Sequence, residues 1–234
     1  MKKTLSILLL LGVYQAHSQR TVTPQYLYWI HYQNQLVLSP KYYWVNEIEN
    51  RRFFNPDVEN QLIAHSHFHY KPGKWDFAGG LTLSWIYAQK PEDGFQHAVF
   101  EIRPFLEASN ELQIGKIYFQ NRVRVDNRFF QANREHTILE DTYYVMRLRY
   151  RLQARIVLKR KENIPTIGLR IGDEIMLHTK QKTFDQNRIY ISMDFAVLKN
   201  LSLEPSYVYV YQQRIVKDEF FSRQVIRFTL IHRI

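Results

Sequence analysis

The sequence predicts an all-β fold, an antiparallel up-and-down transmembrane β-barrel of about 12 strands, within a range of about 10 to 12. Three observations predict it: polar and apolar residues alternate over long stretches, short and long connections alternate along the chain, and Tyr and Trp gather near the ends of the stretches. Alternation with a period of two is the pattern of a strand whose two faces meet different surroundings.

The first residues have the pattern of a secretory signal peptide, which we expect over residues 1–18. Lys2 and Lys3 form its cationic start, an apolar run extends from Leu5 to Val13, and Ala16-His17-Ser18 is a cleavage signal of small residues. Residues 19–234 are then one barrel domain, because no Pro/Gly/Ser-rich linker divides them. No apolar run approaches the roughly 20 residues of a membrane-spanning helix, so strands would have to cross any membrane.

The clearest alternation extends from Tyr143 to Leu158. Its polar face carries Arg147, Arg149, Arg151, Gln153 and Arg155. Its apolar face carries Tyr144, Met146, Leu148, Tyr150, Leu152, Ala154, Ile156 and Leu158. A helix would distribute these arginines around its surface, so a strand is predicted.

Eleven segments follow this pattern, and most are longer than the strands of ordinary globular proteins, which average about 5 to 6 residues. A tilted strand needs about 9 to 11 residues to cross a bilayer. The segments are Gln25 to Tyr32, Leu36 to Glu47, Gln61 to Tyr70, Trp75 to Tyr87, His97 to Glu107, Lys116 to Phe129, Thr142 to Leu158, Thr166 to Leu177, Arg188 to Val197, Leu201 to Gln212 and Phe221 to Arg233.

Two kinds of connection alternate between the segments. The tight turns are Asn34-Gln35, Pro72-Gly73 and Lys199-Asn200. The longer polar loops are Asn50 to Asn60, Ala88 to Phe95, Phe130 to Asp141 and His178 to Asn187. Short turns on one side and long loops on the other are typical of an outer-membrane barrel. Eleven segments do not suit the even strand count of such barrels. We therefore expect either a further strand or a first strand that begins on the outer side after an N-terminal segment that returns through the pore, with about 12 strands favoured and about 10 the next choice.

A soluble barrel would turn the apolar face inward, whereas a membrane barrel turns it toward lipid. Strand length, the signal peptide and the aromatic residues favour the membrane barrel, because Tyr and Trp form girdles at the two interfaces. The expected girdle residues are Tyr26, Tyr28, Trp29, Tyr42, Tyr43, Trp44, Trp75, Trp85, Tyr87, Tyr207, Tyr209 and Tyr211. The expected location is the cell outer membrane, and the expected partners are outer-membrane lipids.

Several short motifs resemble those of a family of uncharacterised Gram-negative outer-membrane β-barrels, a domain of unknown function. They are Trp29, Glu47-Ile48-Glu49 before Arg51 and Arg52, Glu101-Ile102-Arg103, Arg122-Val123-Arg124, Arg147-Leu148-Arg149 and Glu174. The resemblance covers the chain after the signal peptide and implies a barrel with no assigned activity. The chain departs from the usual barrel pattern at its end, where Ile234 stands in place of an aromatic residue.

If the apolar faces meet lipid, the charged faces enclose a lumen. The network expected there is Glu47, Glu49, Glu101, Arg103, Arg122, Arg124, Asp126, Arg147, Arg149, Arg151, Arg170, Glu174 and Asp194, with Glu204, Arg223 and Arg227 on the same faces. Two interpretations stay open: a narrow porin-like channel that attracts small anionic solutes, or an Arg-carboxylate ladder that rigidifies a closed structural barrel. The alternative function is a lipid-binding or phospholipase-like protein built on the same barrel.

His65, His67 and His69 share one face of a strand, about 7 Å apart. Two of them could share a metal, but no further ligand can be assigned, so a polar stripe in the lumen is favoured and no metal or other cofactor is expected. Ser66 points away from these histidines and cannot use one as a base. We therefore expect no enzyme. Asp173 faces lipid by strict alternation unless a bulge turns it inward.

The formal charge of +10 raises the question of nucleic acid. The arginines are spread over several strands at every second position instead of gathering on one exposed helix, and the chain is expected to be exported, so no nucleic-acid partner is expected. The chain has no cysteine, which excludes disulfides and thiolate chemistry. Gly79-Gly80, Gly168 and Gly172 precede no helix, so we interpret them as relief of crowding within strands.

Overall fold

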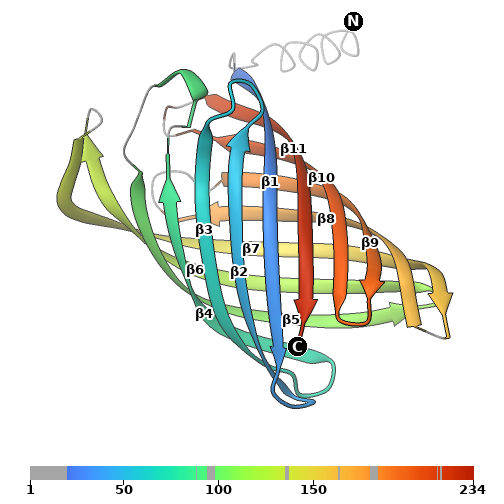
Figure 1. The fold of residues 1–234 in the computed structure, drawn as a ribbon. Helices are drawn as coiled ribbons and strands as arrows, with labels where there is room; N and C mark the ends of the chain where they lie inside the picture. Colours follow the sequence, from blue (N-terminus) through green and yellow to red (C-terminus); the bar gives the residue numbers. More distant parts are fainter. Residues whose placement is uncertain are drawn as a thin grey trace, which may run out of the picture.

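The computed structural model describes residues 20–234 except 88, 94–97, 135–136, 163, 180–183, 215 and 217. The signal peptide expected at residues 1–18 lies outside the described residues. Eleven strands close into one barrel around a lumen (Figure 1). They are β1 Thr21–Val37, β2 Tyr42–Phe53, β3 Glu59–Tyr70, β4 Trp75–Ile86, β5 Val99–Ile114, β6 Ile117–Arg134, β7 Thr137–Lys161, β8 Ile164–His178, β9 Phe184–Leu198, β10 Leu201–Gln213 and β11 Glu219–Arg233. One short 3-10 helix, η1 Pro91–Asp93, lies between β4 and β5.

The expected all-β barrel is confirmed: in the described chain it closes with eleven strands, within the expected range of 10 to 12 and one fewer than the favoured 12. Every neighbouring pair is antiparallel except β1 and β11, which are parallel and in register from Thr21↔Glu219 to Gln35↔Arg233. An odd number of strands places the first and last strands in the same direction, so they can only close the barrel as a parallel pair. Parallel pairing is slightly weaker per residue, and this parallel seam extends along most of both strands.

The first expected turn is also wrong. Asn34 and Gln35 belong to β1, where they pair with Asn46 and Val45 of β2. The chain turns instead near Ser39, whose hydroxyl oxygen accepts hydrogen bonds from the backbone N–H groups of Lys41 and Tyr42. Gln35 lines the lumen cavity, and apolar residues continue the strand after it, so the polarity of this residue marks an inward position and not a turn.

The two kinds of connection lie at opposite ends of the barrel (Figure 1). The short-turn end carries the connections that follow β1, β3, β5, β7 and β9, and the long-loop end carries those that follow β2, β4, β8 and β10. The loop expected at Phe130 to Asp141 is wrong, because β6 and β7 continue through most of it and project beyond the rest of the barrel. Strand β1 begins at the long-loop end and β11 finishes at the short-turn end.

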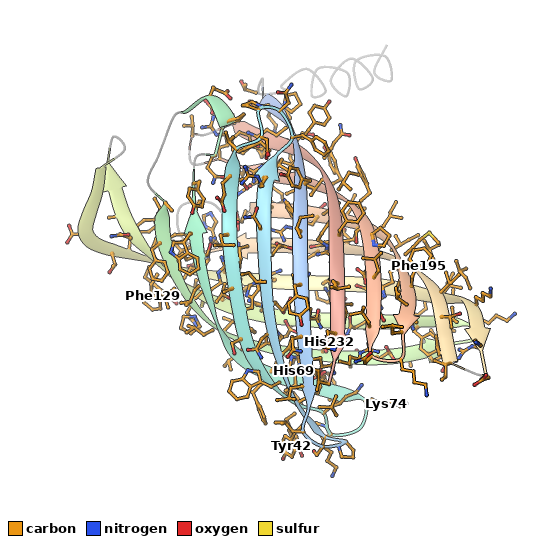
Figure 2. The ribbon with its side chains drawn as sticks, viewed as in Figure 1. Tyr42, His69, Lys74, Phe129, Phe195 and His232 are labelled. Carbon is orange, nitrogen blue, oxygen red and sulfur yellow. The ribbon has the colours of Figure 1, made fainter. Side chains whose placement is uncertain are left out.

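Apolar side chains cover the outside of the barrel. Exposed residues include Ile30 of β1, Phe129 of β6, Leu148 of β7, Ile191 of β9 and Phe228 of β11, and Figure 2 labels Phe129 among the outer side chains. The arginine faces of the same strands are turned inward and are buried or half-buried. The barrel is therefore polar inside and apolar outside, the arrangement that lipid requires and water does not. No helix in the described part of the chain has the length and apolar character to span a membrane.

Three aromatic residues expected at the interfaces line the lumen instead: Trp29, Tyr43 and Tyr87. Trp29 is only 3% exposed, and Tyr43 contacts lumen residues. Trp29 and Tyr43 have odd numbers on strands whose odd positions face inward. The alternation of side chains along the strand therefore overrides the preference of the aromatic ring for the membrane interface. Tyr26, Tyr42, Trp44 and Trp75, in contrast, are exposed.

Candidate functional site: the charged lumen

A cavity of about 1010 Å³ occupies the lumen and is lined by residues from all eleven strands. Ten residues of the expected charge network line it: Glu47, Glu49, Arg103, Arg122, Arg124, Arg147, Arg149, Arg151, Arg170 and Glu174. The other three, Glu101, Asp126 and Asp194, also point inward and are buried behind arginines that contact them. Among the described lining residues, thirteen arginines face seven carboxylates. The surface that the lumen presents is therefore cationic.

Several arginines share one buried carboxylate at a few places in this network, and we call each such carboxylate a node. Asp126 of β6 is the first node. One of its carboxylate oxygens lies 2.7 Å from Nε of Arg124, and the other lies 2.8 Å from Nη2 of Arg147. Arg149 approaches the second oxygen at 3.6 Å. The carboxylate is fully buried, so its charge depends on these guanidinium groups for compensation.

Glu174 of β8 is a second node. It accepts hydrogen bonds from Arg149 on β7, at 3.0 Å to each oxygen, and from Arg122 on β6. The Tyr190 hydroxyl donates a further bond of 2.8 Å from β9. One carboxylate thus ties together side chains of four strands, because inward side chains of β6 reach across β7 to β8.

Two more nodes lie to either side. Glu101 of β5 binds Arg103 at 2.8 Å and Arg128 at 2.6 Å. Asp194 of β9 binds Arg155 at 2.7 Å and Arg170 at 3.2 Å. Arg128 was not among the expected site residues, although it has the same even-numbered alternation on β6 as Arg122 and Arg124.

The three histidines expected on one face of β3 all line the lumen, and two of them, His67 and His69, belong to a chain of polar contacts. His67 and His69 approach through ring nitrogens at 2.7 Å, and His67 also lies 2.7 Å from Oε1 of Glu47. The other oxygen of Glu47 lies 2.8 Å from Nε2 of His31. Figure 2 labels His69 toward the short-turn end of the barrel, near Tyr42 and Lys74.

The chain of contacts ends at Asp76 on one side and at Thr229, whose hydroxyl lies 3.2 Å from Nδ1 of His31, on the other, and His65 lies outside it. His69 lies 2.8 Å from Asp76, which accepts a hydrogen bond from the Tyr43 hydroxyl. His65 contacts Thr82 at 2.6 Å. The sequence could not supply Asp76 or Thr82 as partners, because β4 meets β3 only through the register of the sheet. Within the described residues, no group of three or more His, Cys, Asp or Glu side chains is arranged to hold a metal ion.

The remaining polar positions lie where alternation puts them. The Ser66 hydroxyl is on the outside, where it accepts a 2.8 Å hydrogen bond from Trp44 and donates one of 2.8 Å to Asn46. It therefore lies on the opposite face from the flanking histidines. Asp173 also faces outward and accepts a hydrogen bond from Asn187, so no bulge turns it inward.

At the long-loop end the lumen becomes partly apolar. Leu27, Trp29 and Phe53 are buried there against valines of β10 and β11. Arg51 and Arg188 place their guanidinium groups over the Trp29 ring, at 4.1 Å and 5.5 Å from its centre. Arg188 was not among the expected site residues. It lies two residues before Tyr190 on the inward face of β9, and this alternation could have identified it as a lumen residue.

These features define a class of protein, a closed β-barrel with an apolar outer wall and a charged lumen. The chain belongs to the family described as "Protein of unknown function (DUF2490)", which matches residues 27–220. The family membership expected from the sequence motifs is thereby confirmed.

Two solved structures are similar to this chain. One is "Outer-membrane expressed OmpT of Vibrio cholerae", with 9% identity and a TM-score of 0.39 over 79% of this chain and 60% of that one. The other is "OmpT (in-vitro folded), an outer membrane protein Vibrio cholerae (trimer form)", with 10% identity and a TM-score of 0.39 over 78% of this chain and 59% of that one. The chain thus spans about 60% of the length of these structures. No curated protein matches it.

Proposed function

We propose that this chain is a non-enzymatic outer-membrane β-barrel whose lumen is a narrow passage for small anions. The observation that supports the proposal is the excess of arginine over carboxylate around the cavity. Fixed positive charge in a tube with low-dielectric walls raises the local concentration of anions and repels cations.

The extent of the cavity also supports a passage. Its lining includes Gln35 and Asp76 toward the short-turn end and Tyr87, Gln213 and Val216 at the long-loop end. The apolar outer wall supports lipids of the outer membrane as the surroundings, because water would leave that wall exposed. The expected signal peptide at residues 1–18 supports export.

Planar-bilayer conductance tests the passage. The purified barrel is reconstituted, and the reversal potential is measured under a KCl gradient. We expect single-channel current with a reversal potential of the sign that chloride selectivity requires. A cation-selective current would contradict the cationic lumen as its cause.

Arg151 offers a sharper variant, because it lines the cavity and its described hydrogen bond is to the Gln120 amide instead of a carboxylate. Arg151→Gln should lower the anion-to-cation permeability ratio by about twofold. Lys199→Gln, which removes the same charge from the turn between β9 and β10, should leave the ratio unchanged.

A closed structural barrel is the second candidate, and the nodes at Asp126 and Glu174 favour it. Each node cross-links arginines over the lumen and stiffens the wall. A folded, membrane-inserted barrel that carries no current would support this candidate over the passage. If the protein is released from cells without detergent, both candidates fail, because both require membrane insertion.

A further inference from the structure

Three lumen arginines near the long-loop end have too few carboxylates around them. Arg51 contacts Glu49 at 2.6 Å. Arg188 has a hydrogen bond to the Gln186 amide oxygen, and Arg223 has hydrogen bonds to the amide oxygens of three glutamines. No described carboxylate lies within ion-pair distance of Arg188 or Arg223.

The three guanidinium groups act on one another. The positive charges of Arg51 and Arg188 repel each other, and both repel that of Arg223. Arg51 and Arg188 share the Trp29 ring. Clustered charges out of bulk water require compensation. Only Glu49 is in ion-pair contact with one of the three cations, and Glu174, which acts on Arg188 from a greater distance, is already shared by Arg122 and Arg149.

Trp29 adds an unused donor at the same place. Its side chain is 97% buried and lines the cavity, yet its indole Nε1–H has no hydrogen-bond partner among the described residues. Most buried indole N–H groups donate to an acceptor. The unused donor beside surplus guanidinium groups therefore indicates an absent acceptor with negative charge.

The β4–β5 connection bounds this part of the lumen. Gln89 accepts a 2.9 Å hydrogen bond at its backbone oxygen from Gln25 of β1 and a 3.0 Å bond at its side-chain oxygen from Arg223 of β11. This contact crosses from the β4–β5 side to the seam between β1 and β11. Arg223 is thereby held with its guanidinium plane oriented, as bidentate binding requires.

We propose that Trp29, Arg51, Arg188 and Arg223 form a binding site for a small oxyanion, a phosphate or a carboxylate. Arginine forks pair with the two oxygens of such a group, and the indole N–H donates to it. The proposal rests on the proposed function, since it names a solute class for the cationic lumen, but binding is measurable without conduction.

The test uses the folded full-length barrel in detergent at low chloride, titrated with inorganic phosphate and separately with acetate. Calorimetry reports affinity, and tryptophan fluorescence reports contact with Trp29. We expect saturable binding of at least one of the two anions. Arg188→Gln and Arg223→Gln should each weaken it by about tenfold or more.

Arg155→Gln is the matched control, because it removes one lumen arginine that pairs with Asp194 away from the site. It should change affinity by less than about twofold. Trp29→Phe, which removes only the indole N–H and part of the ring, should weaken binding and abolish the fluorescence change. Circular dichroism establishes that each variant is folded.

The possible outcomes separate the two proposals. Binding that the Arg188 and Arg223 variants weaken, in a barrel without current, supports the site and refutes the passage. Current without binding of phosphate or acetate refutes the proposed site. Binding that the Arg188, Arg223 and Trp29 variants all leave unchanged also refutes it.

Discussion

Gly80 is a residue whose missing side chain shapes the lumen wall. A Cβ atom there would lie 2.4 Å from Cβ of His67 and 2.5 Å from the backbone oxygen of Ser66. Gly80→Ala should therefore destabilise the barrel by about 1 to 3 kcal/mol, because the backbone of β3 would have to move. Gly79→Ala is the control, since its nearest neighbour lies at an ordinary 3.4 Å. Urea unfolding measures both, and equal stability of the two variants would refute the steric reason.

Glu174 tests the node that ties four strands. Glu174→Gln leaves the buried guanidinium groups of Arg122 and Arg149 without their main partner and should cost about 3 to 5 kcal/mol. Glu219→Gln removes an ion pair with Arg214 that is partly exposed at the long-loop end and should cost less than about 1 kcal/mol. The midpoints of denaturant unfolding compare them. Similar losses for both variants would show that burial of the node does not matter.

At the scale of the element, the loop between β2 and β3 depends on Asp57. Hydrogen bonds from Arg52 and then from Tyr28 lower the pKa of its carboxyl group below the ordinary value. A lowered pKa in the folded state means that the ionised form stabilises the loop above the ordinary pKa, and that this stabilisation is lost as the pH falls through the lowered value.

Asp57→Asn should accordingly increase hydrogen exchange of the loop amides of Phe53 and Phe54 at pH 7, where the wild-type carboxylate is ionised. Near pH 2 the wild type and the variant should converge. Protection factors measured by mass spectrometry decide this, and a difference that persists at low pH would assign the effect to the amide side chain instead of the charge.

The parallel seam between β1 and β11 is the second element-scale test. Ile30 pairs directly with Phe228, and both side chains point outward. Because the chain has no cysteine, a double variant Ile30→Cys and Phe228→Cys should form a single disulfide on oxidation. Ile30→Cys with Ile226→Cys is displaced by two residues and should cross-link poorly. The reverse preference in non-reducing electrophoresis would refute the eleven-strand closure.

At the scale of the whole molecule, a charged residue placed on the outer wall should destabilise the barrel more at the middle of the bilayer than near its surface. Ile191 lies at the middle of β9, between the middles of β8 and β10, and is exposed. Ile191→Arg should destabilise the folded barrel in lipid vesicles by about 2 to 4 kcal/mol, whereas Val197→Arg, at an exposed odd-numbered position near the end of the same strand, should cost about 0 to 1 kcal/mol. A soluble protein would tolerate both, so equal tolerance would argue against a membrane barrel.

The sequence by itself determined the strands and their inward and outward faces, but it misplaced the first turn and the loop at Phe130 to Asp141. Alternation with a period of two is a local pattern. The face on which each arginine of β7 lies can therefore be inferred from β7 alone. The same logic correctly places Ser66 and Asp173 outside. It failed at Asn34-Gln35, because a polar pair does not distinguish a turn from a strand in which Gln35 points into the lumen.

Only the tertiary structure decided the strand number, the closure and the partners of the lumen charges. The pairing of β1 with β11 joins the two ends of the described chain, so no local pattern records it. The meeting of Arg122 with Glu174, of His69 with Asp76, and of Arg188 with Trp29 depends on the register and curvature of a closed sheet. Those contacts bring together residues on strands far apart in the sequence, because a side chain's direction is set locally while its neighbour is set by the whole barrel.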